Sequence, residues 1–165
     1  MSRVETPEIE DKRLKLELRL AQLSRLEACQ DSFLTFVKAM WPEFIAGHHH
    51  KVIADKLERV AKGEVKRLIV NMPPRHTKSE FASFLFPAWL IGKNPAMKII
   101  QATHTTELAV NFGRKVKNLL EREEYQEIFD NTRLAVDSKA SGRWDTSRGG
   151  MYYAVGVGSN LAGPK

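Results

Sequence analysis

The feature that most constrains the fold is a short apolar run that leads through a polar loop into a helical pattern. Residues 67–72 are mostly apolar, as is typical of a buried parallel strand. The loop 72–79 follows, and a helix is predicted from Lys78 onwards, with Pro87 expected to kink or shorten it. A second strand is predicted over residues 98–103. Strand, loop, helix and strand in this order indicate a βαβ unit, so the chain is predicted to have an α/β fold.

Further helices are predicted from apolar periodicity and capping residues. They cover residues 8–28, 49–62 and 107–121, together with a short helix from Asp31 or Ser32 to Trp41. The last of them carries its apolar side chains at Leu108, Phe112, Val116, Leu119 and Leu120. The first is predicted to be amphipathic, with Leu16, Leu20 and Leu23 on one face. It is interpreted either as a packed or tethering helix or as a docking helix for a partner subunit.

The C-terminal part is predicted to change character. Residues 134–136 and 151–157 have the composition of strands. A polar, glycine-rich connection through Trp144 and Gly150 is expected to join them.

Charge and hydropathy limit the class of partner. Lysine and arginine total 26 against 20 acidic residues, a net charge of +6, which favours polyanionic partners or a solvated basic surface. The longest apolar stretch, residues 81–92, is about half the length that spans a bilayer, and no secretory leader follows Met1. A cytoplasmic protein without membrane contact is therefore expected. Cys29 is the single cysteine and is expected to be a packed apolar residue in a reducing compartment.

The loop 72–79 has the residues that a nucleotide phosphate loop needs at its C-terminal end. In such a loop a lysine reaches the outer phosphates, and the next serine or threonine ligates Mg²⁺. Lys78 and Ser79 stand in this order at a predicted helix start, whose backbone N–H groups and dipole favour an anion. ATP with Mg²⁺ is therefore the predicted cofactor, and Ser79 is the predicted metal-contacting residue.

The loop departs from the usual pattern where glycines are expected. Met72 and Thr77 occupy two positions at which glycine normally lets the backbone bend tightly around phosphate. Pro73 and Pro74 are expected to stiffen the front of the loop, and Arg75 adds a second cation. An ordinary strand-to-helix turn with a basic tip is the alternative interpretation.

Residues 71–80 resemble the Walker A segment of tailed-phage terminase large subunits, the motors that translocate viral DNA into procapsids. In that family the residue before the lysine is glycine or, in some members, threonine, as Thr77 is here. Further segments agree in the same order along the chain, so the resemblance covers roughly residues 30–163. These segments are residues 41–57 with the run His48-His49-His50, residues 99–109, and residues 142–146, 149–150 and 154–158.

The resemblance implies an incomplete P-loop NTPase of the RecA/ASCE type, a parallel sheet with flanking helices. Residues 1–30 would form an N-terminal helical segment, and residues 31–165 a partial ATPase domain that stops before the Walker B strand. In the family that strand carries a magnesium-binding Asp and a catalytic Glu, and a nuclease domain follows. Neither is recognised in this sequence. The complete family protein is thus implied to be an ATPase, whereas this chain alone is expected to be inactive in hydrolysis.

The resemblance also implies roles for individual side chains. The nucleotide-binding loop comprises Pro74, Arg75, His76, Thr77, Lys78 and Ser79. His50 is expected near adenine, with a surface or packed histidine as the alternative. Arg143 is expected to act as an arginine finger toward the ATP of a neighbouring subunit, and Arg75 is its rival for this catalytic role. Thr103 and His104 end a predicted strand, where α/β folds place ligands.

The implied partners are double-stranded DNA, the portal protein and the small terminase subunit, with assembly into a homo-oligomeric ring and no membrane. Two other interpretations stay open. Another DNA-dependent P-loop ATPase, such as a helicase, shares the strand–loop–helix unit. A non-catalytic assembly or binding fragment would use the N-terminal helix and the basic surface, and would leave the phosphate loop without a role.

Overall fold

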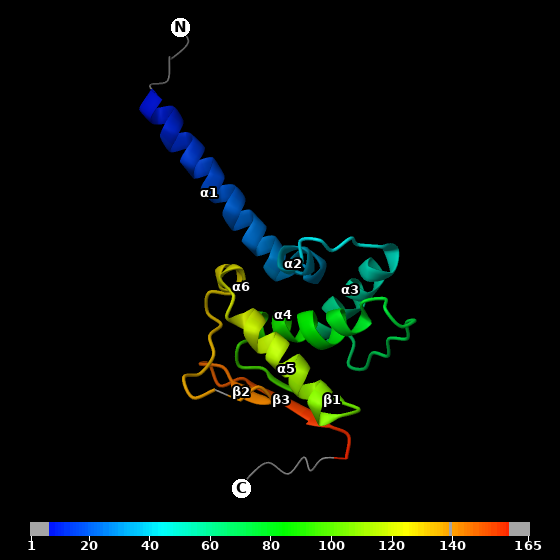
Figure 1. The fold of residues 1–165 in the computed structure, drawn as a ribbon. Helices are drawn as coiled ribbons and strands as arrows, with labels where there is room; N and C mark the ends of the chain where they lie inside the picture. Colours follow the sequence, from blue (N-terminus) through cyan, green and yellow to red (C-terminus); the bar gives the residue numbers. More distant parts are fainter. Residues whose placement is uncertain (1–6, 139, 159–165) are drawn as a thin grey trace.

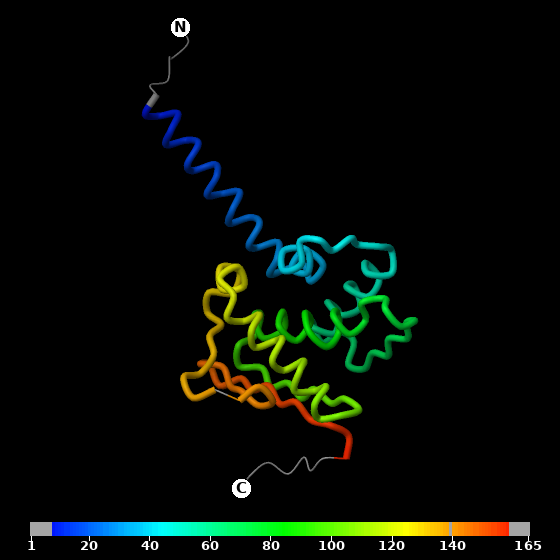
Figure 2. The backbone as a smooth tube through the Cα atoms, viewed as in Figure 1, coloured from blue at the N-terminus to red at the C-terminus, as the bar shows by residue number. Residues whose placement is uncertain are grey.

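Residues 7–138 and 140–158 are described by the computed structural model, and they form a mixed α/β fold (Figures 1 and 2). The predicted α/β class is confirmed at this level. Helices pack against a three-stranded sheet that is mixed rather than wholly parallel. Within the described ranges, none of the helices has the length and apolar content needed to cross a bilayer.

Helix α1 (Pro7–Asp31) extends away from the rest of the molecule as a rod about 37 Å long (Figure 1). Exposed ion pairs one turn apart support it, including Glu8 with Lys12 and Asp11 with Lys15. Its leucines are largely exposed and lie on two opposite sides, namely Leu14 and Leu18 on one, and Leu16, Leu20 and Leu23 on the other. The predicted helix is confirmed, and Leu16, Leu20 and Leu23 share one side as predicted. Leu14 and Leu18 on the other side leave the helix without the single apolar face of an amphipathic helix.

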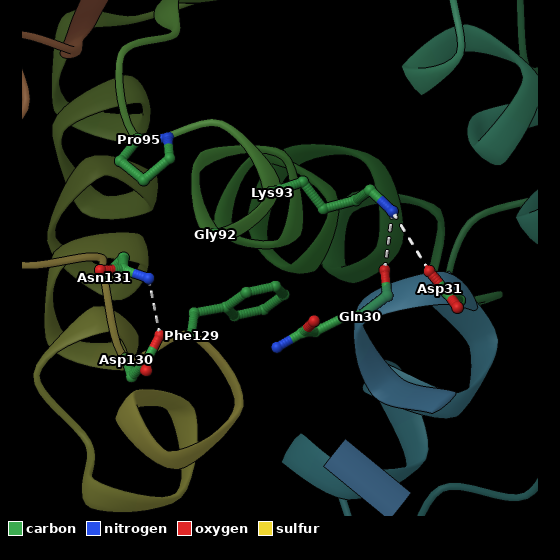
Figure 3. Close-up of a pocket in the computed structure, with 8 residues that line it drawn as sticks. All are labelled: Gln30, Asp31, Gly92, Lys93, Pro95, Phe129, Asp130 and Asn131. Atoms are coloured by element: carbon green, nitrogen blue, oxygen red, sulfur yellow. Dashed lines mark hydrogen bonds and ion pairs between the residues drawn. The ribbon is translucent and has the colours of Figure 1, made fainter. Parts of the chain in front are cut away.

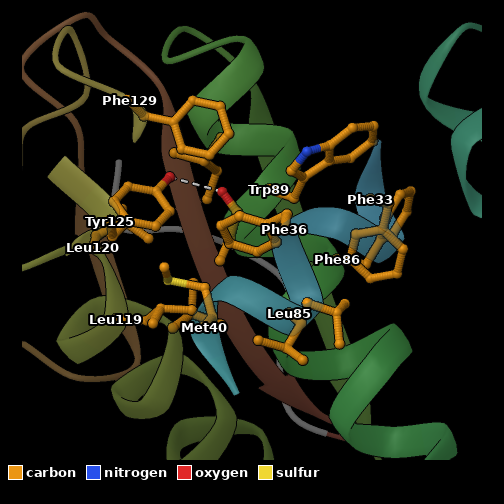
Figure 4. Packing of buried hydrophobic residues seen from close by; sticks show 14 of the residues in the cluster. Phe33, Phe36, Met40, Leu85, Phe86, Trp89, Leu119, Leu120, Tyr125 and Phe129 are labelled. Carbon is orange, nitrogen blue, oxygen red and sulfur yellow. Dashed lines mark hydrogen bonds between the residues drawn. The ribbon is translucent and has the colours of Figure 1, made fainter. Parts of the chain in front are cut away.

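A helical layer follows α1 and contains most of the core. It comprises α2 (Phe33–Met40), α3 (His48–Ala61), the π-helical segment η1 (Glu80–Leu85) and α4 (Phe86–Lys93). The fully buried ring of Phe33 lies 5.5–5.6 Å, centroid to centroid, from the rings of Phe81, Phe86 and Trp89. Figure 4 shows aromatic side chains from several helices gathered in this core.

Local capping sets the boundaries of α2 and α3 as predicted. The Ser32 side chain accepts a hydrogen bond from the backbone N–H of Thr35 at the start of α2. Glu58 of α3 accepts a hydrogen bond of 2.7 Å from the backbone N–H of Phe33, which ties the two helices together. Beyond α3, Gly63 has a φ of 77°, the left-handed conformation that commonly ends a helix.

Pro87 does not end the helix that begins at Lys78. The turn before it widens into the π-helical segment η1, in which the backbone N–H of Phe86 reaches the carbonyl of Phe81. A wider turn accommodates a proline ring that would otherwise collide with the carbonyl four residues earlier. In place of the predicted kink or shortening, the helix changes from π-helical to α-helical just before Pro87.

The sheet joins distant parts of the chain in the order β1-β3-β2. Strand β1 (Lys98–Thr103) pairs in parallel with β3 (Met151–Gly156), and both confirm predicted strands. Strand β2 (Arg143–Asp145) pairs antiparallel with β3, and its Trp144 stacks on Tyr152 with ring centroids 4.9 Å apart. β2 lies where a loop was predicted, because three residues are too few to give a strand pattern.

Helix α5 (Thr106–Leu120) covers one face of this sheet through small residues. Ala109 and Gly113 are buried against it, and a Cβ at Gly113 would lie 2.5 Å from the carbonyl oxygen of Ser141. The buried side of α5 therefore includes these small residues as well as most of the predicted apolar ones. Val116 is buried as predicted, together with Leu119 and Leu120, whereas Leu108 is 45% exposed.

Two predicted strands are absent from the described residues. The segment 67–72 pairs with no described strand, although its side chains alternate between half-buried and exposed as they would in one. A strand needs a hydrogen-bonded neighbour, which an apolar run alone does not guarantee. The segment 134–136 forms only an isolated bridge between Leu134 and Thr146. It follows α6 (Glu123–Ile128), a short helix that was not predicted.

Replacing Gly113 with alanine tests the packing of α5 on the sheet. In an exposed helix, alanine is about 1 kcal/mol better than glycine. Here the added methyl group would meet the Ser141 backbone, and overpacking of this kind costs about 1–3 kcal/mol. We therefore expect Gly113→Ala to lower the free energy of unfolding, measured by chemical denaturation. Asn118→Ala, at an exposed position of the same helix, is the control and should not destabilise the protein.

Candidate phosphate-binding loop

The chain between α3 and η1 curls into a loop that borders an open hollow of about 510 Å³. Residues 72–80 supply the whole lining, so the loop wraps around its own concavity. The backbone of this loop leads directly into the helical turn that begins at Lys78. The first residues of that helical turn, Lys78 to Glu80, therefore line the hollow, and the positive end of a helix favours anions.

Two residues of the loop adopt the left-handed backbone conformation. The φ angles are 64° at Arg75 and 60° at Thr77, although neither residue is a glycine. This conformation is disfavoured by about 1–2 kcal/mol for an L-residue and is unusual for a β-branched one. Left-handed residues turn successive N–H groups toward one point, as in anion-binding backbone nests. Thr77 thus has the conformation that explains why a glycine was expected at its position.

His50 of α3 contacts the loop through two consecutive hydrogen bonds. Its Nδ1 accepts a hydrogen bond of 2.9 Å from the backbone N–H of Gly47, so the neutral ring carries its proton on Nε2. That Nε2–H donates to Oγ1 of Thr77 at 2.7 Å, and the Thr77 hydroxyl donates to the carbonyl of His76 at 2.6 Å. His50 is only 7% exposed. Its expected contact with adenine stays a prediction.

The surroundings of His50 favour its neutral form. Its ring stacks on Phe81 with centroids 5.2 Å apart, and the Phe44 ring is inclined to it by 75° with centroids 4.7 Å apart. Burial lowers the pKa of His50 below its ordinary value of 6.5, and the neighbouring imidazoles of His49 and His76 lower this pKa further.

The polar side chains expected to bind phosphate are exposed at the loop. Within the described ranges, the side chains of Arg75, Lys78 and Ser79 take part in no hydrogen bond or ion pair. His76 differs, because its Nδ1 donates to the carbonyl of Pro74 at 2.9 Å. Two cations without a local counter-ion beside a concave backbone give the loop a positive potential.

Ser79 fits a magnesium ion that is bound together with a nucleotide. Mg²⁺ usually keeps several waters and binds through one or two protein oxygens plus substrate phosphates. The hydroxyl of Ser79 offers one such oxygen. In the described part of the chain, no group of three or more His, Cys, Asp or Glu side chains is placed to hold a metal on its own.

The other predicted residues belong to the sheet and the turn after it. Arg143 is exposed on β2, and Figure 1 shows β2 at the other end of the molecule from the loop between α3 and η1. It therefore has no access to the phosphate loop of its own chain, and its role toward a neighbouring subunit stays a prediction. Thr103 donates to the carbonyl of Thr105, which caps α5, while His104 is exposed.

One ion pair next to the loop was not predicted. Lys115 of α5 lies 2.9 Å from the carboxylate of Glu80, the residue that follows Ser79. The pair joins the sheet-covering helix to the helix that carries the phosphate-loop residues. No signal in the sequence identifies it, because its partners are 35 positions apart in separate elements.

A second hollow, of about 390 Å³, lies where α1 meets the end of α4 (Figure 3). Lys93 donates to the carbonyl of Gln30 at 2.9 Å, and the Gln30 side chain donates to the carbonyl of Ile128. Nearby, the indole of Trp89 donates to the carbonyl of Cys29, a buried residue as expected, and burial raises the pKa of the Cys29 thiol. These contacts anchor α1 and give the hollow a structural role.

Comparisons of the chain with models of known families, with curated proteins and with solved structures yield no match.

The pKa of His50 predicts a loss of stability in acid. Because the folded state lowers this pKa, the stability that the neutral ring contributes is fully present above about pH 6.5, the ordinary value. It is lost as the pH falls below 6.5 toward the folded-state pKa. We expect the free energy of unfolding to decrease between pH 7.5 and 5.5, and to decrease less in His50→Gln, which does not titrate.

The matched control is His48→Gln, which removes an exposed histidine from the same run. It should keep the pH dependence of the unmodified chain. An identical pH dependence in His50→Gln and in the unmodified chain would contradict the assignment to His50.

Proposed function

We propose that the loop 72–80 binds the phosphates of a nucleoside triphosphate, with ATP and Mg²⁺ as the ligand. The observation that carries this proposal is the combination of a self-lined hollow, left-handed backbone at Arg75 and Thr77, and cations without counter-ions. The backbone N–H groups at the helix start would bind phosphate oxygens. Lys78 would reach the outer phosphates, and Arg75 would add a second positive charge.

The order Lys78-Ser79 supports ATP with Mg²⁺ over a free anion. Bound Mg²⁺ would neutralise charge between the β- and γ-phosphates, and the Ser79 hydroxyl would orient it. A surface patch that binds any anion has no need for a hydroxyl next to the lysine at a helix start. This specific order is what distinguishes the proposal from a merely basic loop.

We further propose that the chain is the nucleotide-binding part of a terminase large subunit, a P-loop ATPase of the RecA/ASCE type. The resemblance of residues 71–80 and of the later segments supports this, as does the parallel pairing of β1 with β3. In the complete motor, ATP hydrolysis would drive double-stranded DNA into a procapsid in the host cytoplasm. Portal protein, small subunit and a homo-oligomeric ring belong to that proposal, and Arg143 would serve there as the arginine finger.

For this chain alone the proposal extends to nucleotide binding and not to hydrolysis. Hydrolysis needs a magnesium-binding Asp and a catalytic Glu at the end of a buried strand. Within the described residues, β1 ends at Thr103 and β3 at Gly156, and neither strand ends in a carboxylate pair. The segment 159–165, which contains the last part of the resemblance, lies outside the described residues.

A non-catalytic binding module is the second candidate, and α1 favours it. This helix extends from the molecule with exposed leucines on two sides, which would suit contact with partner helices. In that case charge substitutions on α1, such as Lys15→Glu, would change function while Lys78→Ala would not. A DNA-dependent helicase is the remaining enzyme alternative, and DNA-stimulated unwinding would identify it.

Lys78→Ala tests the proposed nucleotide binding. Loss of a charge-assisted bond worth about 1.5–3 kcal/mol should weaken affinity roughly 10- to 100-fold. We expect a fluorescent Mg·ATP analogue to bind the unmodified chain saturably and the variant with at least a tenfold higher Kd.

Lys51→Ala removes an exposed lysine from α3 and should leave this Kd unchanged. Equal binding by the unmodified chain and Lys78→Ala would exclude the loop as the site. Absence of binding in both proteins would favour the binding module.

A further inference from the structure

We propose that His50 is a positioning residue for the loop 72–80, and that its hydrogen bond to Thr77 holds the loop in a conformation that glycine adopts without help. The inference concerns how the loop keeps its shape. Only its consequence for ligand binding rests on the phosphate-binding function proposed above.

The need for such a residue follows from the backbone at Thr77. A β-branched residue with a φ of 60° is strained, and a strained conformation persists only where its surroundings hold it in place. The hydroxyl of Thr77 provides the means, because it both accepts from Nε2–H of His50 at 2.7 Å and donates to the carbonyl of His76 at 2.6 Å. This chain of two bonds connects α3 with the strained turn.

His50 is itself held rigidly enough to act in this way. Its Nδ1 accepts a hydrogen bond from the backbone N–H of Gly47, and the rings of Phe81, Phe44 and His49 lie 3.8–5.2 Å from it, centroid to centroid. Phe81 is 1% exposed and belongs to the helix that starts at Lys78. The imidazole therefore lies between the aromatic core and the loop. Its Nδ1 is bonded to Gly47 and its Nε2 to Thr77.

The importance of His50 then depends on which residue stands at position 77. With threonine, removal of the imidazole leaves the strained residue without its hydrogen bond. With glycine, the left-handed conformation carries no steric penalty, so the imidazole is no longer needed for it. A histidine that only packs against the core, or that contacts adenine directly, would matter equally in both cases.

The experiment is a double-mutant cycle between His50→Phe and Thr77→Gly in the full chain. His50→Phe keeps an aromatic ring on Phe81 and removes both nitrogens, so the core stays filled. We expect His50→Phe alone to weaken binding of the fluorescent Mg·ATP analogue about tenfold, which corresponds to 1.4 kcal/mol. In the Thr77→Gly background the same change should alter the Kd by less than about twofold, or roughly 0.4 kcal/mol.

Thr77→Val is the matched variant, because it changes the acceptor of the hydrogen bond from His50. It keeps the β-branched shape and the strain but lacks the hydroxyl, so it should weaken binding as much as His50→Phe does. An equal loss from His50→Phe with threonine and with glycine at position 77 would overturn the inference. Normal binding by Thr77→Val would overturn it as well.

A readout that needs no nucleotide separates this inference from the proposed function. Arg75 and Lys78 are trypsin sites within the loop, and cleavage there reports how often the loop leaves its ordered conformation. We expect faster cleavage after Arg75 in His50→Phe and in Thr77→Val than in the unmodified chain, at equal global stability.

Unchanged cleavage in both folded variants would overturn the inference whatever the nucleotide affinity. Faster cleavage together with no nucleotide binding by any of the proteins would support the role of His50 and reject the proposed function. A variant that fails to fold is recognised by cleavage throughout the chain, and Thr77→Val then provides the test, because residue 77 lies outside the core.

Discussion

The packing of Phe33 against Phe81, Phe86 and Trp89 is the contact on which the helical layer depends. Phe33 opens α2, whereas its three partners belong to the helix that follows the phosphate loop. Aromatic pairs of this kind contribute about 0.5–1.5 kcal/mol each beyond the area they bury. Because Glu58 also accepts a hydrogen bond from the backbone N–H of Phe33, these contacts connect α2, α3 and the continuous helix η1–α4.

The same cluster extends to the functional loop through a single side chain. Phe81 contacts Phe33 on one side and the imidazole of His50 on the other, and His50 binds Thr77. The aromatic core thus supports the strained turn through His50. Lys78 and Ser79, at the adjacent helix start, are exposed to solvent. Burial of apolar rings offsets the backbone strain at Thr77, so the stability of the core and the shape of the loop are coupled.

Features set by local sequence could be predicted, and features set by distant contacts could not. The cap at Ser32, the glycine after α3, strand β1 and the helix start at Lys78 follow from short-range signals. The strand predicted over residues 67–72 is absent from the described sheet. An apolar run indicates burial, but it does not specify the neighbouring strand with which a segment pairs. Thr77 looked like a defect in the phosphate-loop pattern, since its partner His50 lies 27 positions earlier in another element.

Among the described residues, the loop is held from its helical side, because the segment before it pairs with no described strand. Residues 67–72 and β1 show the same alternation of burial, with Ile69 and Ile100 86% and 60% exposed on the outward side. In the described part of the chain, segment 67–72 has no ladder hydrogen bonds to a neighbouring strand through which it could support the loop. A glycine at position 77 would relieve strain but offer no side chain for support. Threonine accepts the strain and supplies the hydroxyl that connects the loop to α3.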